Sequence, residues 1–371
     1  MTDCGFLSMY KNTYDSYCSP GQALNLFVQF NLKVLKMKTV KNNTQLTDWA
    51  EFARKRKEYE TPSLRKSIWQ IVNTFIPYIA LWFLIIYSLS VSYLLTFFLI
   101  VLAAGFLVRL FIIFHDCGHG SFFKSEKANR IVGTVFGILA FTPYHKWHNL
   151  HMKHHATVGN LSKRGLGDVW TMTKDEYVHS SRKKQFGYRM YRNPWIMFGL
   201  GPIFMFLINH RLTANWMTRQ QKLNVHFTTL VLVALIVGMS FIIGVTTFVI
   251  IQLSILYLAG MAGLWLFYLQ HQFEDVIWLD NEEWNYQTVA LEGSSFVKFP
   301  KILQWFSGNI GFHHIHHISS RIPNYNLPIV YKEMDVFKVK PVAFRDSLKT
   351  LRLRLWDEDA GRLIGFDEVK G

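Results

Sequence analysis

Three short groups of histidines have the residue type and the spacing of metal ligands. They are His115 and His119 in HDCGHG, His151, His154 and His155 in HMKHH, and His313, His316 and His317 in HHIHH. Residues three or four apart share one face of a helix, so each group points its imidazoles in one direction. Neutral imidazole commonly binds iron, zinc, copper or nickel. The spacing therefore predicts a metal centre rather than a histidine-rich surface loop, which is usually low in complexity.

Further polar residues extend this prediction. His271, in QHQFED, follows a long apolar run and is a ninth candidate ligand. His148 and His314 are weaker candidates because each adjoins one of the three groups. Four other histidines are expected to face solvent or to lie behind the ligands: His145, His179, His210 and His226. Carboxylates often orient metal-bound imidazoles, and the candidates here are Asp116, Asp168, Glu274 and Asp275.

Long apolar runs must position these histidines. Four runs have about the 20 residues that a membrane-spanning helix needs: Ile68–Ser88, Ser92–Phe114, Phe227–Val245 and Phe248–Leu269. The uncharged segments Leu89–Val91 and Thr246–Thr247 would be the turns of two hairpins. The expected fold is an all-α integral membrane protein, with four transmembrane helices in two hairpins and a cytosolic helical cap that carries the histidines.

The distribution of basic residues predicts the orientation in the membrane. The net charge is +15, and Lys and Arg flank the apolar runs but avoid both turns. Under the positive-inside rule, both termini and the middle segment face the cytosol of a multi-pass cell-membrane protein. The shorter runs Ile131–Tyr144 and Pro194–Ile208 are expected at the membrane surface, which keeps the first two histidine groups on one side. Arg109, inside the second span, is expected to reach toward the interface, with a structural pairing near the histidines as the alternative.

The remaining segments complete the domain organisation. Residues 1–36 form a possible upstream extension, with Met37 as an alternative start, and 37–67 form a cytosolic N-terminal segment. Residues 68–328 form the membrane domain, and 329–371 form a cytosolic tail that we expect to be helical. The three cysteines are too few for a disulfide framework. Basic stretches beside apolar spans favour lipid headgroups or an acidic protein as partners over nucleic acid.

The three histidine motifs, in this order and with paired spans around them, resemble the membrane fatty-acid desaturase family from about Ile68 to Pro328. The segments FYLQHQFED, GSSFVKFPKILQWFSGNIGFHHIHH and SSRIPNYNL are similar to bacterial acyl-lipid Δ5 desaturases. The resemblance implies that the eight histidines of the three groups bind iron. His271 matches an additional ligand of related acyl-CoA desaturases, although those relatives have an asparagine where this chain has Phe267.

The function implied is the O2-dependent desaturation of lipid acyl chains. An alkyl C–H bond needs an oxidant that no side chain supplies, and two iron ions with O2 as co-substrate could supply it. Electrons would come from a small acidic carrier such as ferredoxin or flavodoxin, since the sequence has no haem module or dinucleotide motif. We expect a cis double bond in the acyl chains of membrane glycerolipids, at carbon 5.

Two alternatives remain at this point. A lipid hydroxylase or a carotenoid-modifying oxygenase of the same superfamily would share the histidine ligands. A histidine-rich metal transporter would place its ligands near the middle of the membrane. The histidine groups of this chain instead adjoin the ends of the apolar runs.

Overall fold

The computed structural model describes residues 41–165 and 167–369. The possible extension 1–36 and the alternative start at Met37 lie outside the described residues. The chain divides into two compact units, residues 1–55 and 56–371. In the first unit, the described residues belong to helix α3 (Lys41–Tyr59), where Lys55 and Glu51 form an ion pair at 2.9 Å. The second unit contains every candidate site residue.

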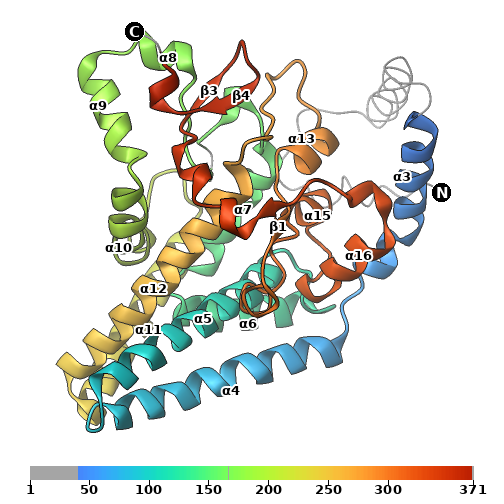
Figure 1. The fold of residues 1–371 in the computed structure, drawn as a ribbon. Helices are drawn as coiled ribbons and strands as arrows, with labels where there is room; N and C mark the ends of the chain where they lie inside the picture. Colours follow the sequence, from blue (N-terminus) through green and yellow to red (C-terminus); the bar gives the residue numbers. More distant parts are fainter. Residues whose placement is uncertain (1–40, 166, 370–371) are drawn as a thin grey trace. The chain divides into compact units, whose positions relative to one another are not determined.

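Four helices of the second unit are long and apolar enough to cross a membrane. They are α4 (Leu64–Ser88), α5 (Tyr93–Gly118), α11 (Arg219–Ile243) and α12 (Val245–His271). This confirms the predicted all-α membrane fold with two hairpins (Figure 1). Three of the four, α4, α5 and α11, begin with side-chain caps typical of helix N-termini, supplied by Ser63, Ser92 and Thr218.

The turn of the second hairpin differs from the prediction. Thr246 and Thr247 lie inside α12, and the chain reverses at Gly244 instead. Gly244 has a φ of 82°, a left-handed conformation that glycine adopts without the steric cost of a side chain. The predicted turn at Leu89–Val91 is confirmed between α4 and α5. The position of the turn is therefore set by the conformational freedom of Gly244 and not by the polarity of the two threonines.

Neither of the two shorter apolar runs forms a helix long enough to span. The first belongs to α6 (Glu126–Leu139), which packs on α5. The second consists of the π-helical segments Trp195–Leu200 and Phe204–Ile208, joined by α10 (Gly201–Ile203). Between α6 and this run lie α7 (Tyr144–Thr157), α8 (Lys174–Val178) and α9 (Arg182–Tyr191).

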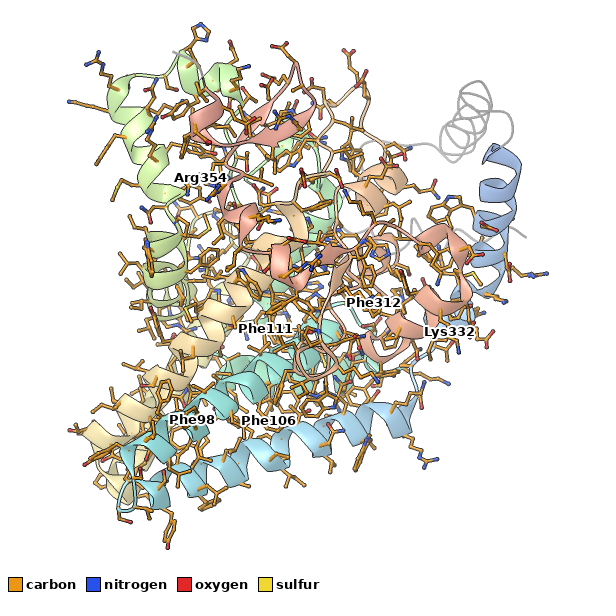
Figure 2. The ribbon with its side chains drawn as sticks, viewed as in Figure 1. Phe98, Phe106, Phe111, Phe312, Lys332 and Arg354 are labelled. Carbon is orange, nitrogen blue, oxygen red and sulfur yellow. The ribbon has the colours of Figure 1, made fainter. Side chains whose placement is uncertain are left out.

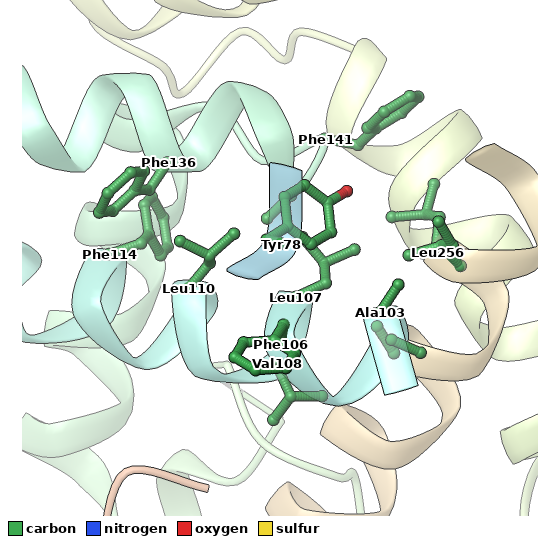
Figure 3. Close-up of a cluster of buried hydrophobic side chains, with 14 of the residues drawn as sticks. Tyr78, Ala103, Phe106, Leu107, Val108, Leu110, Phe114, Phe136, Phe141 and Leu256 are labelled. Carbon is green, nitrogen blue, oxygen red and sulfur yellow. The ribbon is translucent and has the colours of Figure 1, made fainter. Parts of the chain in front are cut away.

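The core lies where the two hairpins meet. Helix α5 packs against α4, α6 and α12, and it buries more of its length than the other long helices. Figure 3 shows Leu107, Leu110 and Phe114 of α5 beside Tyr78 of α4 and Phe136 of α6. Leu110 and Phe114 are fully buried. This packing fixes the direction in which the end of α5 points.

The remaining elements form a cap at the end of the hairpins opposite their turns (Figure 1). They include α13 (Tyr286–Glu292), α14 (Lys301–Phe306), α15 (His313–Ile318) and α16 (Leu327–Glu333). Strands β1 (Val297–Lys298) and β2 (Val342–Ala343) pair in parallel, and β3 (Leu355–Asp357) pairs antiparallel with β4 (Arg362–Ile364). Figure 2 labels Phe312 and Arg354 among the side chains of this cap, and Phe98 far from it on α5.

The tail was expected to be helical, and this was largely wrong. Beyond α16 it consists of short 3-10 helices, strand β2 and the β3–β4 hairpin. Leu355 and Trp356 of β3 and Leu363 and Ile364 of β4 are buried. Strands this short carry too little alternation for a period-2 pattern to be recognised in the sequence.

Candidate metal centre

Four helices bring the candidate ligands together. Helix α5 ends at the first histidine motif, and the second motif lies within α7. The long helix α12 ends at His271, and the third motif forms nearly all of α15. The two hairpins place the ends of α5 and α12 at the same end of the fold. The histidines of α7 and α15, which are connected to these helices by loops, lie beside those of α5 and α12 there.

All nine predicted histidines fall into two adjacent groups. The five-histidine group is His115, His119, His151, His155 and His316, and the four-histidine group is His154, His271, His313 and His317. Within each group, one ring nitrogen of every histidine lies within 4.8 Å of the corresponding nitrogen of each other member. Every candidate ligand in these two groups is an imidazole.

Helical geometry explains how one motif serves both groups. In α7, His151 and His155 are four residues apart and enter the five-histidine group, whereas His154 enters the other. In α15, His313 and His317 are four apart and enter the four-histidine group. Positions four apart lie nearly above one another on a helix, whereas neighbours diverge by about 100°. The motif H-x-x-H-H therefore bridges two sites.

The ring nitrogens face common points. Six pairs of Nε2 atoms are 3.0 to 3.2 Å apart, including His115 with His151 and His271 with His313. His151 Nε2 contacts both His115 and His155. A ring nitrogen carries one hydrogen or one lone pair, so His151 cannot satisfy two such partners. Adjacent ligands at right angles around a metal with bonds of about 2.1 Å lie about 3.0 Å apart, which fits this spacing.

Burial favours the uncharged form of the imidazoles in α7 and α15. Burial lowers the pKa of His155 and of His317 well below the ordinary value, and the neighbouring histidines lower both further. The same causes act in the same order on the pKa of His154 and His316. A neutral imidazole keeps the lone pair that a metal ion binds. The site is therefore prepared for a cation without first losing protons near neutral pH.

Of the four candidate carboxylates, Asp116 alone contacts a candidate ligand in the described part of the chain. Its Oδ1 lies 3.3 Å from His115 Nδ1. Its Oδ2 accepts hydrogen bonds from Asn324, from the backbone N at 2.7 Å and from Nδ2 at 2.8 Å. Asp275 instead pairs with exposed Lys340, and Glu274 is exposed. His271 Nδ1 lies 3.3 Å from the Gly293 carbonyl, which can orient that ring.

Asp168, the fourth carboxylate, accepts a hydrogen bond from the Gly165 backbone N at 2.6 Å. Burial raises its pKa to about 6, partly offset by this bond. It therefore stabilises a loop after α7 rather than a ligand.

Aromatic rings border both groups. Trp147 stacks on His151 with ring centroids 4.3 Å apart, and it also packs on Phe114. Phe267 lies beside His154 and His271 at 5.2 and 5.5 Å. The related acyl-CoA desaturases named above have an asparagine at this position, where this chain has the apolar ring of Phe267. These rings exclude water from one side of each group.

The other histidines lie outside the two groups. His314 Nε2 lies 3.0 Å from the Phe337 carbonyl, and His148 stacks on Tyr144. His179 and His226 are exposed, as expected, whereas His210 is buried beside the Phe141 carbonyl. Sequence reasoning missed Asn324 and Trp147, because nothing in their local sequence marks them as neighbours of the histidines.

Comparisons with known proteins agree with this arrangement. The family model described as fatty acid desaturase matches residues 92–338. A relative named fatty acid desaturase, from Bacillus subtilis (strain 168), is 47% identical over 313 residues, which cover 84% of this chain and 89% of the relative.

More distant relatives carry more specific names. An sn-1 oleoyl-lipid 12-desaturase from Synechocystis sp. is 26% identical over 61% of this chain and 64% of its own length. A chloroplastic omega-6 fatty acid desaturase from Arabidopsis thaliana is 27% identical over 60% of this chain and 50% of its own length.

Proposed function

Because this chain belongs to the fatty acid desaturase family, we propose that it is a di-iron acyl-lipid desaturase that uses O2 to introduce a cis double bond into membrane glycerolipids. The observation that carries the proposal is the pair of adjacent all-imidazole groups at one end of four apolar helices. The named lipid substrates of its relatives support glycerolipid acyl chains as the substrate class.

The donor set fits two metal ions. The ligands would be the five-histidine group for one ion and the four-histidine group for the other. Imidazole accepts several transition metals, so the choice of iron rests on the reaction. Iron, reduced from outside and exposed to O2, would supply the oxidant for an unactivated C–H bond.

The protein's own residues hold the centre and shield it. Asp116 keeps the hydrogen of His115 on Nδ1, which leaves Nε2 to face the five-histidine group. Trp147 and Phe267 cover His151 and His154 and so exclude water from the reacting carbon. The apolar surfaces of α5 and α6 would align the acyl chain beside the histidines.

The location and the electron donor follow from charge. We propose a multi-pass cell-membrane enzyme with both termini and the histidine groups on the cytosolic side. A small acidic carrier such as ferredoxin or flavodoxin would deliver the electrons, since the net charge of +15 favours an acidic partner.

The proposed position of the double bond is carbon 5. It rests on the similarity of the segments around His271 and His313 to acyl-lipid Δ5 desaturases. It also agrees with a centre at the ends of the spans, because carbons near the ester lie closest to the headgroup level.

The test is expression in a host whose lipids contain only saturated chains, followed by mass spectrometry of derivatised lipids. We expect a new alkene at carbon 5 with the wild-type chain and none with His154→Ala. A hydroxylated chain without an alkene would refute the desaturase function. An alkene at carbon 9 or 12 would refute only the position.

A further inference from the structure

A second polar site lies at the same end of the long helices as the histidines. It is a pocket of about 550 Å³ between the start of α4, the last turns of α5, α14 and the segment before α16. Three cations line it, Lys66, Arg109 and Lys301, together with several side-chain amides and two tryptophans. The lining includes no Asp or Glu. The pocket therefore has the charge of an anion site.

Arg109 is the deepest of the three cations. Its side chain was expected to reach toward the interface, but it is only 7% exposed. The guanidinium stacks on Trp305, with 3.9 Å to the ring centroid, and it donates to the Trp305 carbonyl and to Thr74 Oγ1. Within residues 41–165 and 167–369, none of the ion pairs includes Arg109. A buried charge without a counterion is costly, so an anionic ligand would stabilise it.

The two lysines add charge at the mouth of the pocket. Lys66 and Lys301 are exposed, and Lys66 Nζ donates to Asn326 Oδ1 at 3.1 Å. In the described part of the chain, neither lysine has a carboxylate partner. One arginine, two lysines and neutral amide donors are the groups that bind a phosphate, because its several oxygens accept many hydrogen bonds.

The surface around the pocket faces the membrane. Large apolar side chains beside it are exposed, with Trp69 at 63%, Ile68 at 49% and Ile302 at 72%. Because α4 is apolar enough to cross a bilayer, Ile68 and Trp69 would contact lipid. Tryptophans such as Trp69 and Trp305 are typical of the membrane–water interface. An anion at this depth would arrive attached to acyl chains.

The pocket is also connected to the metal centre. Asn324 lines it and donates to Asp116, which contacts His115. Arg109 precedes His115 by six residues on α5, about 9 Å along the helix axis. We propose that this pocket binds the phosphate of a glycerophospholipid and, resting on the proposed function, that this lipid is the substrate whose first acyl carbons reach the histidines.

The binding test uses the purified full chain and native mass spectrometry. The probes are phosphatidylglycerol and an uncharged, phosphate-free glucosyl diacylglycerol with the same acyl chains. We expect Lys66→Gln and Lys301→Gln each to weaken phosphatidylglycerol binding about fivefold, and the double variant to weaken it about 25-fold if the effects add. Lys222→Gln, which alters a lysine at the start of another span and outside the pocket, should bind like the wild type.

Three results would overturn the binding site: an unchanged affinity in the double variant, a glycolipid bound as tightly as phosphatidylglycerol, or displacement of the lipid by inorganic phosphate at equal affinity. The last would assign the site to free phosphate.

Kinetics test whether the bound lipid is the substrate. In the double variant we expect the KM for phosphatidylglycerol to rise with kcat unchanged, since the lysines touch no reacting atom. Weakened binding with an unchanged KM would overturn the substrate role. A wild-type chain that binds this lipid but desaturates nothing would refute the proposed function and leave the binding site supported.

Discussion

Replacing Asp116 by asparagine tests how the first ligand is held. Asp116 Oδ1 faces His115 Nδ1 at 3.3 Å, and Oδ2 accepts two hydrogen bonds from Asn324. Because His115 Nε2 faces the five-histidine group, its hydrogen lies on Nδ1, and all three neighbours of Asp116 are donors. An asparagine at this position would point its NH2 group at a hydrogen-bond donor in either orientation, at His115 Nδ1–H in one and at the Asn324 donors in the other.

The size of the effect follows from these contacts. Asp116→Asn removes the charge from the hydrogen bonds and leaves at least one buried donor unpaired, which costs about 1–3 kcal/mol. Replacing such partners of metal ligands typically weakens metal binding about 10- to 100-fold, or about 1.4–2.8 kcal/mol. We therefore expect the variant to fold and to bind the metal of the five-histidine group more weakly by that factor.

The assay is titration of the metal-free protein with ferrous iron under anaerobic conditions, with the bound iron measured per chain. Glu274→Gln is the matched control, since Glu274 is exposed and contacts none of the nine histidines in the described structure. Asp116→Asn should lose occupancy at limiting iron and recover it at high iron. An Asp116→Asn protein that binds iron like the wild type would refute the role of this carboxylate.

Four further predictions can be checked on the same protein. His154→Ala should abolish turnover and His179→Ala should preserve it, measured as alkene formed per enzyme. Chelation should lower the thermal midpoint, and ferrous iron should restore both stability and activity, because metal binding couples to folding. The metal-free protein should lose stability as pH falls from about 6.5 toward 4. Burial lowers the pKa of His314 in the folded protein to about 4, so over this range only the unfolded chain takes up a proton on His314. His314→Gln should reduce the dependence of stability on pH. An impermeant thiol reagent on intact cells should label Ser90→Cys and miss Ser180→Cys; labelling at 180 would contradict the proposed topology.

The sequence predicted those features of the fold and of the candidate site that depend on the spacing of residues within one helix. The nine candidate histidines lie on helix faces or at a helix end, so their spacing predicted that they would gather. The four apolar runs were found for the same reason, since length and composition suffice to identify them. His271 was found because the helix that carries it ends at the correct side of the fold.

The sequence was less informative where the partner is distant. Nothing near Asp116 identifies Asn324, which lies 208 positions away along the chain. The sequence favoured an interfacial Arg109 over a paired one because its partners Thr74 and Trp305 belong to other helices. The division of the histidines between two groups was also hidden, because it depends on how α7 and α15 face each other.

The order of the histidines along the chain has a consequence for biosynthesis. His115 and His317 are 202 residues apart, so about 10–40 s of translation separates them at about 5–20 residues per second. Once α7 has been made, four of the five imidazoles of the first group exist, but only His154 of the second. At that stage the first candidate metal group is nearly complete, whereas the second has one of its four histidines. Helix α15 is the last of the four histidine-bearing helices to be made, and it supplies the remaining histidines of both groups.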